Sequence, residues 1–343
     1  MKLGDGRTRI KTSRPFVRWR KRESWPPYDL IEETIADRAQ RKLDRLERLY
    51  HVGQDKVWDG RQVLADLIRK HGRPQLDPAR REPALRILSV LLWGELAAWA
   101  ISADLAERID DVEAKMAATS QAHDEARHFY VLRDYLRAVG EPVPRLGGLG
   151  RRLLLGILET DSLVHKLVGM QLLVESNALA LFRGLVDAQV EPVLAELLPY
   201  YERDEARHVG LGVLYLPRLL RDLSTVELAG VAAFQIRCLA LLMTAGLTLR
   251  KDFPALGMNA REMATHTVKL QNDIVREMLS IADPDAGRPR GSVRGILNPA
   301  KGIGPRILDF LHPPNGYAAA PRWQRAALDL WTAGARIADR ALA

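Results

Sequence analysis

Two copies of the pentad Asp-Glu-Ala-Arg-His occur in this 343-residue chain, at 124–128 and 204–208, each inside an apolar segment. The glutamate and the histidine of each copy are three residues apart, so on a helix both side chains lie on one face. A single carboxylate precedes each glutamate by 30 residues, Glu95 in the first copy and Glu175 in the second. Unpaired charges are costly to bury, whereas carboxylates and imidazoles that bind a metal are not. The pattern therefore predicts a metal site.

A shift of 80 residues superimposes the two copies and pairs Glu95 with Glu175. Such self-similarity indicates an internal repeat. Two antiparallel helices of about 15 residues each, joined by a turn, would bring the two glutamates of one copy to the same level along the helix axes. The midpoints fall at Asp110 and at Val190, which are suitable turn positions. Each copy is therefore predicted to be an antiparallel helical hairpin whose two glutamates face each other.

The elements that position these residues are predicted to be helices, because apolar residues recur at spacings of three and four among Ala, Leu, Arg and Glu. Gly140 is a suitable helix C-cap before a linker at 141–150, and Pro217 is expected to kink or end its helix. The predicted helices cover about 30–50, 78–109, 111–139, 152–188, a segment from Pro192 onward, 224–250, 258–282 and 321–343.

The predicted fold class is all-α: two hairpins joined by one long crossover form a four-helix bundle, with further helices at both ends. Residues 1–24 form a basic tail that we expect to be flexible. Residues 25–282 form the helical domain, with the core bundle at about 80–220. Residues 283–320 are rich in Gly and Pro and are expected to be irregular. Residues 321–343 form a C-terminal helix.

The net charge of +8 lies mostly in the tail, where nine basic residues face two acidic ones. The tail is either a solvated arm or an arm that contacts an acidic partner. One cysteine, Cys238, excludes an internal disulfide and a cysteine-based metal site. Neither a signal peptide nor an uninterrupted apolar run of membrane-spanning length is apparent. We therefore expect a cytoplasmic protein without a membrane span.

The paired pentads, with their single glutamates in register, resemble the ferritin-like di-iron-carboxylate superfamily over about residues 80–220. Its oxygen-activating members are the most similar: multicomponent monooxygenase hydroxylases, ribonucleotide reductase small subunits and aminobenzoate N-oxygenase-type enzymes. The resemblance implies a ferritin-like bundle with one metal at Glu95, Glu125 and His128. It implies a second metal at Glu175, Glu205 and His208, with Glu125 and Glu205 as the bridging ligands.

The resemblance also implies supporting residues around the ligands. Asp124 and Asp204 are expected to hold the N–H groups of the ligand histidines, and Arg127 and Arg207 to pair with those aspartates. A substrate pocket is expected between the core helices, lined by apolar residues. Its further candidate residues each lie one helical turn from a glutamate: Gln121, Gln171, Leu179 and Tyr201.

The resemblance implies an enzyme with two iron ions, or with manganese and iron, that activates dioxygen. Its substrate would be a partly apolar small organic molecule, which is hydroxylated, N-oxygenated, desaturated or cleaved. A ferredoxin or a flavin reductase would supply electrons, and the chain would form a homodimer. Three alternatives remain open at this point: a ferroxidase or iron-binding protein, a di-iron hydroxylase acting on tRNA, and a structural bundle without metal.

Overall fold

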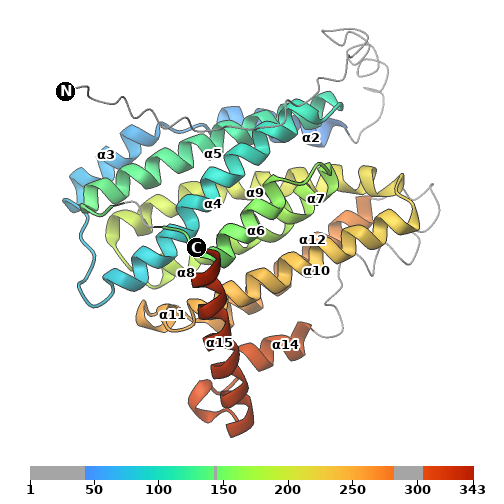
Figure 1. Ribbon diagram of the computed structural model, residues 1–343. Helices are drawn as coiled ribbons and strands as arrows, with labels where there is room; N and C mark the ends of the chain where they lie inside the picture. The colour runs from blue at the N-terminus through green and yellow to red at the C-terminus, as the bar shows by residue number, and fades with distance from the viewer. Residues whose placement is uncertain (1–42, 143–144, 282–303) are drawn as a thin grey trace, which may run out of the picture.

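The computed structural model describes residues 43–142, 145–281 and 304–343 of the chain (Figure 1). The basic tail, most of the predicted helix at 30–50 and most of the segment 283–320 lie outside the described residues. Within the described ranges every regular element is helical, which confirms the predicted all-α class.

The first hairpin consists of α4 (Arg81–Arg108) and α5 (Val112–Val139), joined by a turn at residues 109–111. The Asp111 side chain caps α5 by accepting from the main-chain N–H of Ala114 at 2.9 Å. Gly140 ends the helix with φ 89°, the left-handed conformation that glycine adopts without strain. The predicted turn and the predicted C-cap are both confirmed.

The second hairpin consists of a π-helical segment, η1 (Val168–Val174), that runs directly into α8 (Glu175–Asp187), and of α9 (Pro192–Arg221). The turn lies at residues 188–191, as predicted. The Glu191 side chain caps α9 through the N–H of Leu194, 2.9 Å away. It also accepts a hydrogen bond from Tyr135 of the first hairpin at 3.0 Å. The two hairpins pack with α5 against α9, which confirms the predicted four-helix bundle with one long crossover.

The predicted continuous helix at 152–188 is wrong. The chain instead forms α6 (Gly148–Leu158), a break at 159–162, α7 (Leu163–Leu167) and the π-helical segment. In the break, Thr160 and Ser162 bind nearby main-chain N–H groups with their hydroxyls and so compete with helix bonding. The Lys166 ammonium donates to the carbonyl of Leu158 at 2.7 Å and satisfies the end of α6. The crossover is therefore longer than predicted and contains two short helices.

Two further predictions differ from the structure. Of the two outcomes predicted for Pro217, a kink or an end of the helix, the end is wrong: α9 continues to Arg221, and Leu216 and Leu220 in this last turn are buried in the core. The segment 283–320, expected to be irregular, contains α14 (Gly304–Leu311) and a 3-10 turn at Tyr317–Ala319. Its Gly-Pro pair at 304–305 stands in the first turn of α14, where proline is tolerated, and Ile307 and Leu308 follow after Arg306.

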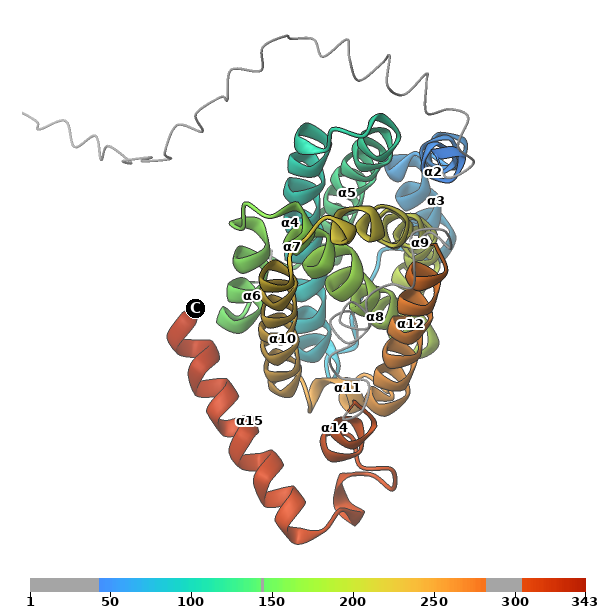
Figure 2. The same cartoon turned by 90° about the vertical axis from the view of Figure 1, so that its right-hand side faces the viewer.

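The remaining helices surround the bundle: α2 (Leu43–Asp55), α3 (Gly60–His71), α10 (Thr225–Thr248), α11 (Asp252–Ala255), α12 (Ala260–Ile281) and α15 (Arg322–Leu342). Helices α2 and α3 pack on α5 and α9, and α12 packs on α8 and α9. Figure 2 shows α15 as an outer helix beside α10 and α6. Neither α3 nor α11 was predicted.

Helices α4 and α10 are both long and apolar enough to cross a membrane by composition. In the fold, 56% of the most apolar 18-residue window of α4 is buried, and 28% of that of α10. Helix α4 is an inner element of the bundle, so its hydropathy is accounted for by the protein core. The predicted cytoplasmic location stays a prediction.

Candidate metal centre

Six residues of the two repeats meet at the middle of the bundle. Glu95 comes from α4, Glu125 and His128 from α5, Glu175 from the start of α8, and Glu205 and His208 from α9. None of the six is more than 4% exposed. The spacings of 3 and 30 residues thus bring four carboxylates and two imidazoles to one buried place.

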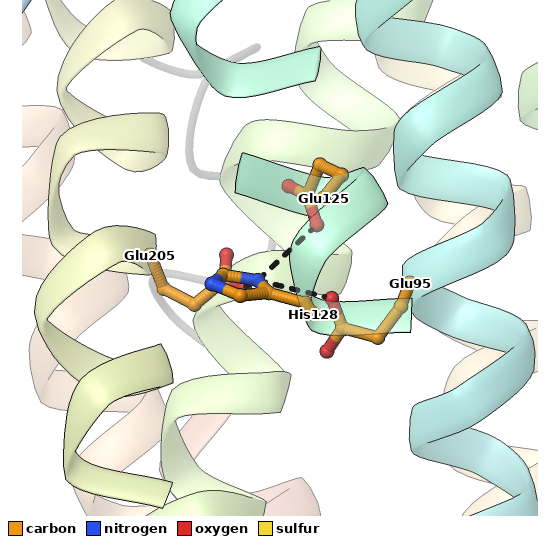
Figure 3. A group of neighbouring side chains, drawn as sticks. All are labelled: Glu95, Glu125, His128 and Glu205. Atoms are coloured by element: carbon orange, nitrogen blue, oxygen red, sulfur yellow. Dashed lines mark ion pairs between the residues drawn. The ribbon is translucent and has the colours of Figure 1, made fainter. Parts of the chain in front are cut away.

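The six side chains form two overlapping groups. One contains Glu95, Glu125, His128 and Glu205 (Figure 3), and the other contains Glu125, Glu175, Glu205 and His208. In each group the candidate ligand atoms lie within 4.8 Å of one another. Glu125 and Glu205 belong to both groups, as two bridging ligands would.

Both histidines present the same nitrogen to the carboxylates. His128 Nδ1 lies 3.3 Å from an oxygen of Glu95 and 3.3 Å from one of Glu205. His208 Nδ1 lies 2.9 Å from an oxygen of Glu125 and 3.2 Å from one of Glu205. The Nδ1 atoms are therefore the ones directed at the centre of each group.

The opposite nitrogens are bound by aspartates, and the pairing is crosswise between the repeats. His128 Nε2 lies 3.2 Å from Asp204, and His208 Nε2 lies 3.3 Å from Asp124. A carboxylate only accepts, so each Nε2 carries the proton and donates it. This fixes the tautomer that leaves Nδ1 available as a ligand.

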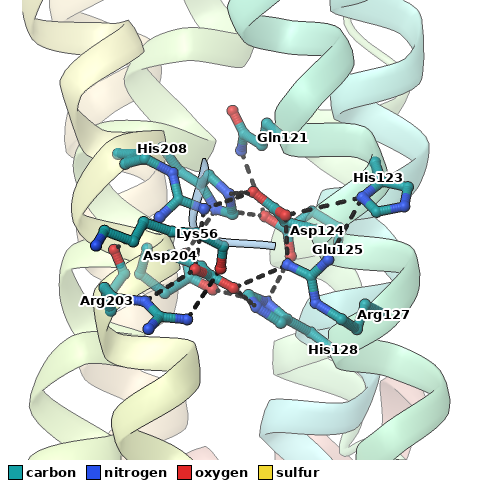
Figure 4. A network of polar contacts seen from close by, with 12 residues as sticks. Lys56, Gln121, His123, Asp124, Glu125, Arg127, His128, Arg203, Asp204 and His208 are labelled. Atoms are coloured by element: carbon teal, nitrogen blue, oxygen red, sulfur yellow. Dashed lines mark hydrogen bonds and ion pairs between the residues drawn. The ribbon is translucent and has the colours of Figure 1, made fainter. Parts of the chain in front are cut away.

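The arginines of the two pentads close this arrangement into a ring. Figure 4 shows Arg127 beside Asp124 and Asp204. Arg127 donates to Asp124 and, at 2.9 Å, to Asp204. Arg207 donates to the same two aspartates at 2.9 Å each. Arg127 is buried and Arg207 nearly so. Charge-assisted bonds of this kind hold the aspartates, and through them the imidazoles, in fixed positions.

Trp58, which precedes α3, is a site residue that the sequence did not reveal. Its indole N–H donates to Asp204 at 2.7 Å, and the guanidinium of Arg127 lies 4.9 Å from its ring. Trp58 lies outside the 80-residue repeat, so no repeated motif indicates its role. It makes the surroundings of Asp204 different from those of Asp124.

The arrangement of donors fits two divalent cations. Three buried atoms of the ligand residues have no hydrogen-bond partner in the described structure: Glu125 Oε2, Glu175 Oε2 and His128 Nδ1. Burial raises the pKa of both Glu95 and Glu175 well above the usual range, as expected for carboxylates that lack a cation. A mixture of carboxylate and imidazole donors suits iron and manganese.

The two imidazoles also indicate a site for cations. Burial lowers the pKa of His128, but the hydrogen bond to Asp204 and the nearby negative charges of the glutamates outweigh burial and raise that pKa overall. The pKa of His208 is likewise raised overall, because the attraction of Glu125 and Glu205 outweighs burial. The carboxylates thus favour a positive charge at each Nδ1, and a bound cation supplies one in place of a proton.

The four further candidates lie around the two groups. Tyr201 is fully buried; its ring stacks on His128 at 4.3 Å and its hydroxyl donates to the His128 carbonyl at 2.8 Å. Gln121, its counterpart in the repeat, donates to Glu175 at 2.6 Å, and Gln171 contacts Gln121 at 3.4 Å. Leu179 is half-buried in the hydrophobic core. One group therefore has an aromatic neighbour and the other an amide neighbour.

The cavity beside His208 is small. It has a volume of about 10 Å³ and is lined by side chains that include Ser120, Gln121, Asp124 and Arg207. This is about the space of one water molecule. It is not the apolar substrate pocket expected between the core helices. Of the four pocket candidates, only Gln121 lines it.

Comparison with known proteins gives no family. No family model and no curated protein matches the chain. Solved structures of variants of R2-like ligand-binding oxidase overlap loosely. Two variants, one with a Mn/Fe and one with an Fe/Fe cofactor, are 18% and 17% identical over 75% of this chain and 92% of theirs, at TM-scores of 0.44 and 0.45. Another, with Mn/Fe, is 17% identical over 69% and 92%, at 0.46. These overlaps are too loose to assign a family, so the metal centre is inferred from this chain's own residues.

Proposed function

We propose that the chain binds two divalent metal ions, either iron at both positions or manganese and iron, and oxidises a small organic substrate with dioxygen. The observation that carries this proposal is the pair of buried ligand groups that share Glu125 and Glu205. Two cations placed in those groups would be bridged by two carboxylates and would each have one imidazole. Donor sets of this kind belong to the di-iron and di-manganese carboxylate bundles.

In this proposal Glu95 and His128 serve one position and Glu175 and His208 the other. Bound in the reduced state at these residues, the two ions would supply the electrons for dioxygen activation. The chain's own part is to fix the ligands. The ring of Asp124, Asp204 and their arginines orients the imidazoles, and Gln121 restrains one oxygen of Glu175.

The surroundings indicate a substrate with an apolar part, because the helices that carry the six ligands also bury leucine and valine side chains. The cavity of about 10 Å³ holds no such molecule, so side chains have to move when a substrate enters. An external donor, a ferredoxin or a flavin reductase, would return the ions to their reduced state. Hydroxylation, N-oxygenation, desaturation and cleavage all fit this scheme.

The test is a titration of the metal-free protein with Fe(II) under nitrogen, followed by rapid mixing with oxygen and recording of visible spectra. We expect two Fe(II) per chain and a transient absorption band. Glu205→Gln removes one shared ligand and should bind fewer than two ions tightly. Glu202→Gln is the matched control, because Glu202 lies on the same helix but pairs with Arg183, away from the centre. Failure to bind iron or manganese stoichiometrically would contradict the proposal.

A ferroxidase is the second candidate, and the small cavity favours it, since iron and oxygen need no organic pocket. The same mixing experiment separates the two. An oxygenase oxidises about two Fe(II) per chain and then stops until a reductant is added. A ferroxidase continues to oxidise many equivalents of Fe(II) per chain. The tRNA-acting alternative depends on the basic tail, and RNA binding that is unchanged by deletion of residues 1–24 would count against it.

A further inference from the structure

The outward face of α15 carries a line of large apolar side chains. Trp323, Leu330 and Ile337 are 67%, 76% and 70% exposed. They follow one another at intervals of seven residues, so they lie in one row along the helix. Exposed apolar rows of this length mark contact surfaces on soluble proteins.

This row is additional to the face that holds α15 on the protein. The inner face buries Leu328 and Ala335 against α10 and α6, in a cluster with Leu149 and Leu247. The Asp339 side chain accepts from the N–H of Leu149 at 2.8 Å, which fixes the C-terminal half of the helix. The outer row therefore stands on a helix that is already anchored (Figure 2).

Small residues accompany the large ones on the outer face. Ala326 and Ala327 lie between Trp323 and Leu330, and Ala333 and Gly334 lie between Leu330 and Ile337. From 323 to 337 this stripe contains no polar or charged side chain. Alternation of large and small residues allows two helices to approach closely, with each large side chain over a small one.

We propose that α15 is a self-association surface, through which two copies of this chain pair with their α15 helices antiparallel. One register places Leu330 opposite the partner's Ala333 and Ile337 opposite the partner's Ala326. In that register Ala327 meets the partner's Gly334, which permits close contact. Trp323 meets the partner's Arg340, a cation that can lie over the indole ring.

Charge complementarity supports the same register. Asp329 and Arg336 flank the stripe on one side of the helix, and the register brings Asp329 beside the partner's Arg336, twice by symmetry. The Asp329 side chain is 59% exposed, although one of its oxygens lies 3.2 Å from Arg250 and the other accepts from the Tyr317 hydroxyl of its own chain. A parallel pairing would place Leu330 on the partner's Leu330 and Asp329 beside the partner's Gly334, without charge complementarity.

The first test is sedimentation of the full-length protein at micromolar concentrations. We expect a dimer whose dissociation constant rises roughly tenfold or more with Leu330→Glu, since a charge enters the centre of the stripe. Val226→Glu is the matched control, because Val226 is 82% exposed on α10 and lies off the stripe. A monomeric protein, or a dimer indifferent to Leu330→Glu, would overturn the proposal.

Two further variants test the register. Arg336→Asp should weaken the dimer, and addition of Asp329→Arg should restore it. Ala326→Cys with Ile337→Cys should give a covalent dimer on oxidation, whereas Ala326→Cys alone should not, because those two sites lie roughly 16 Å apart along the antiparallel pair. Monomers that bind anionic vesicles through the same stripe would identify a membrane-surface helix instead. The inference is independent of the metal centre, so iron binding and dimerisation can fail separately.

Discussion

His128 of the first repeat is held by Asp204 of the second, with 3.2 Å between imidazole Nε2 and carboxylate. The reciprocal contact joins His208 to Asp124. Each half of the centre therefore depends on the pentad of the other half for the orientation of its histidine. This dependence makes the aspartates testable separately from the ligands.

Asp204→Asn should lower the metal affinity of the position that contains His128 by about 10–100-fold, since an amide orients the imidazole less firmly than a carboxylate. Competition with a chelator of known affinity measures this. Asp134→Asn on the same helix as His128 is the control, because Asp134 binds only surface arginines. Equal weakening of both positions would mean that the effect is general loss of structure.

Trp58→Phe keeps an aromatic ring but removes the donor to Asp204. Because a buried charged acceptor loses a bond, we expect the free energy of unfolding to fall by about 1–3 kcal/mol. Urea unfolding of the metal-free protein measures this. Trp99→Phe provides the comparison, since Trp99 is 40% exposed. Similar losses in the two variants would show that the Trp58 bond contributes little.

Gly169→Ala should destabilise the packing of the π-helical segment η1 against α6, because a Cβ there would lie 2.7 Å from Ile157 Cγ1. The expected loss is about 1–3 kcal/mol, and Ile157→Val should recover only the part that comes from the Ile157 Cδ1 contact at 3.0 Å. Gly156→Ala on α6 has no atom within 4 Å of its new Cβ and should instead stabilise by about 0.5–1 kcal/mol. Thermal unfolding of the three variants measures whether each substitution lowers or raises the stability as predicted.

Removal of the metal should lower the melting temperature. Ions that bind the folded chain and not the unfolded one stabilise it by mass action, and here they also relieve the repulsion among four buried glutamates. Scanning calorimetry with and without a chelator measures the difference. Glu205→Gln should reduce that difference strongly, and Glu202→Gln should leave it intact.

The sequence was sufficient for the bundle and for the set of residues at its centre, because an 80-residue repeat and helical geometry determine which side chains can meet. It was not sufficient for the crossover, where hydroxyls at Thr160 and Ser162 compete locally with the helix. Trp58 was missed because its contact with Asp204 spans 146 residues and follows from no periodic pattern. The crosswise pairing of aspartates and histidines depends on how α5 and α9 pack, which spacing alone leaves undetermined.

The interdependence of the repeats extends to their helix caps. Tyr135 of the first repeat binds Glu191, the cap that begins α9 in the second. Asp111, the equivalent cap of α5, lies close enough to Tyr215 to contribute, after burial, to raising the pKa of that phenol to about 12. A chain that held only one such repeat could cap its helices, but it could not complete either ligand group, because each group contains residues of both repeats. It would have to find the missing ligands in a second copy of itself. The two-repeat chain is in this sense a homodimer whose subunits have been joined end to end.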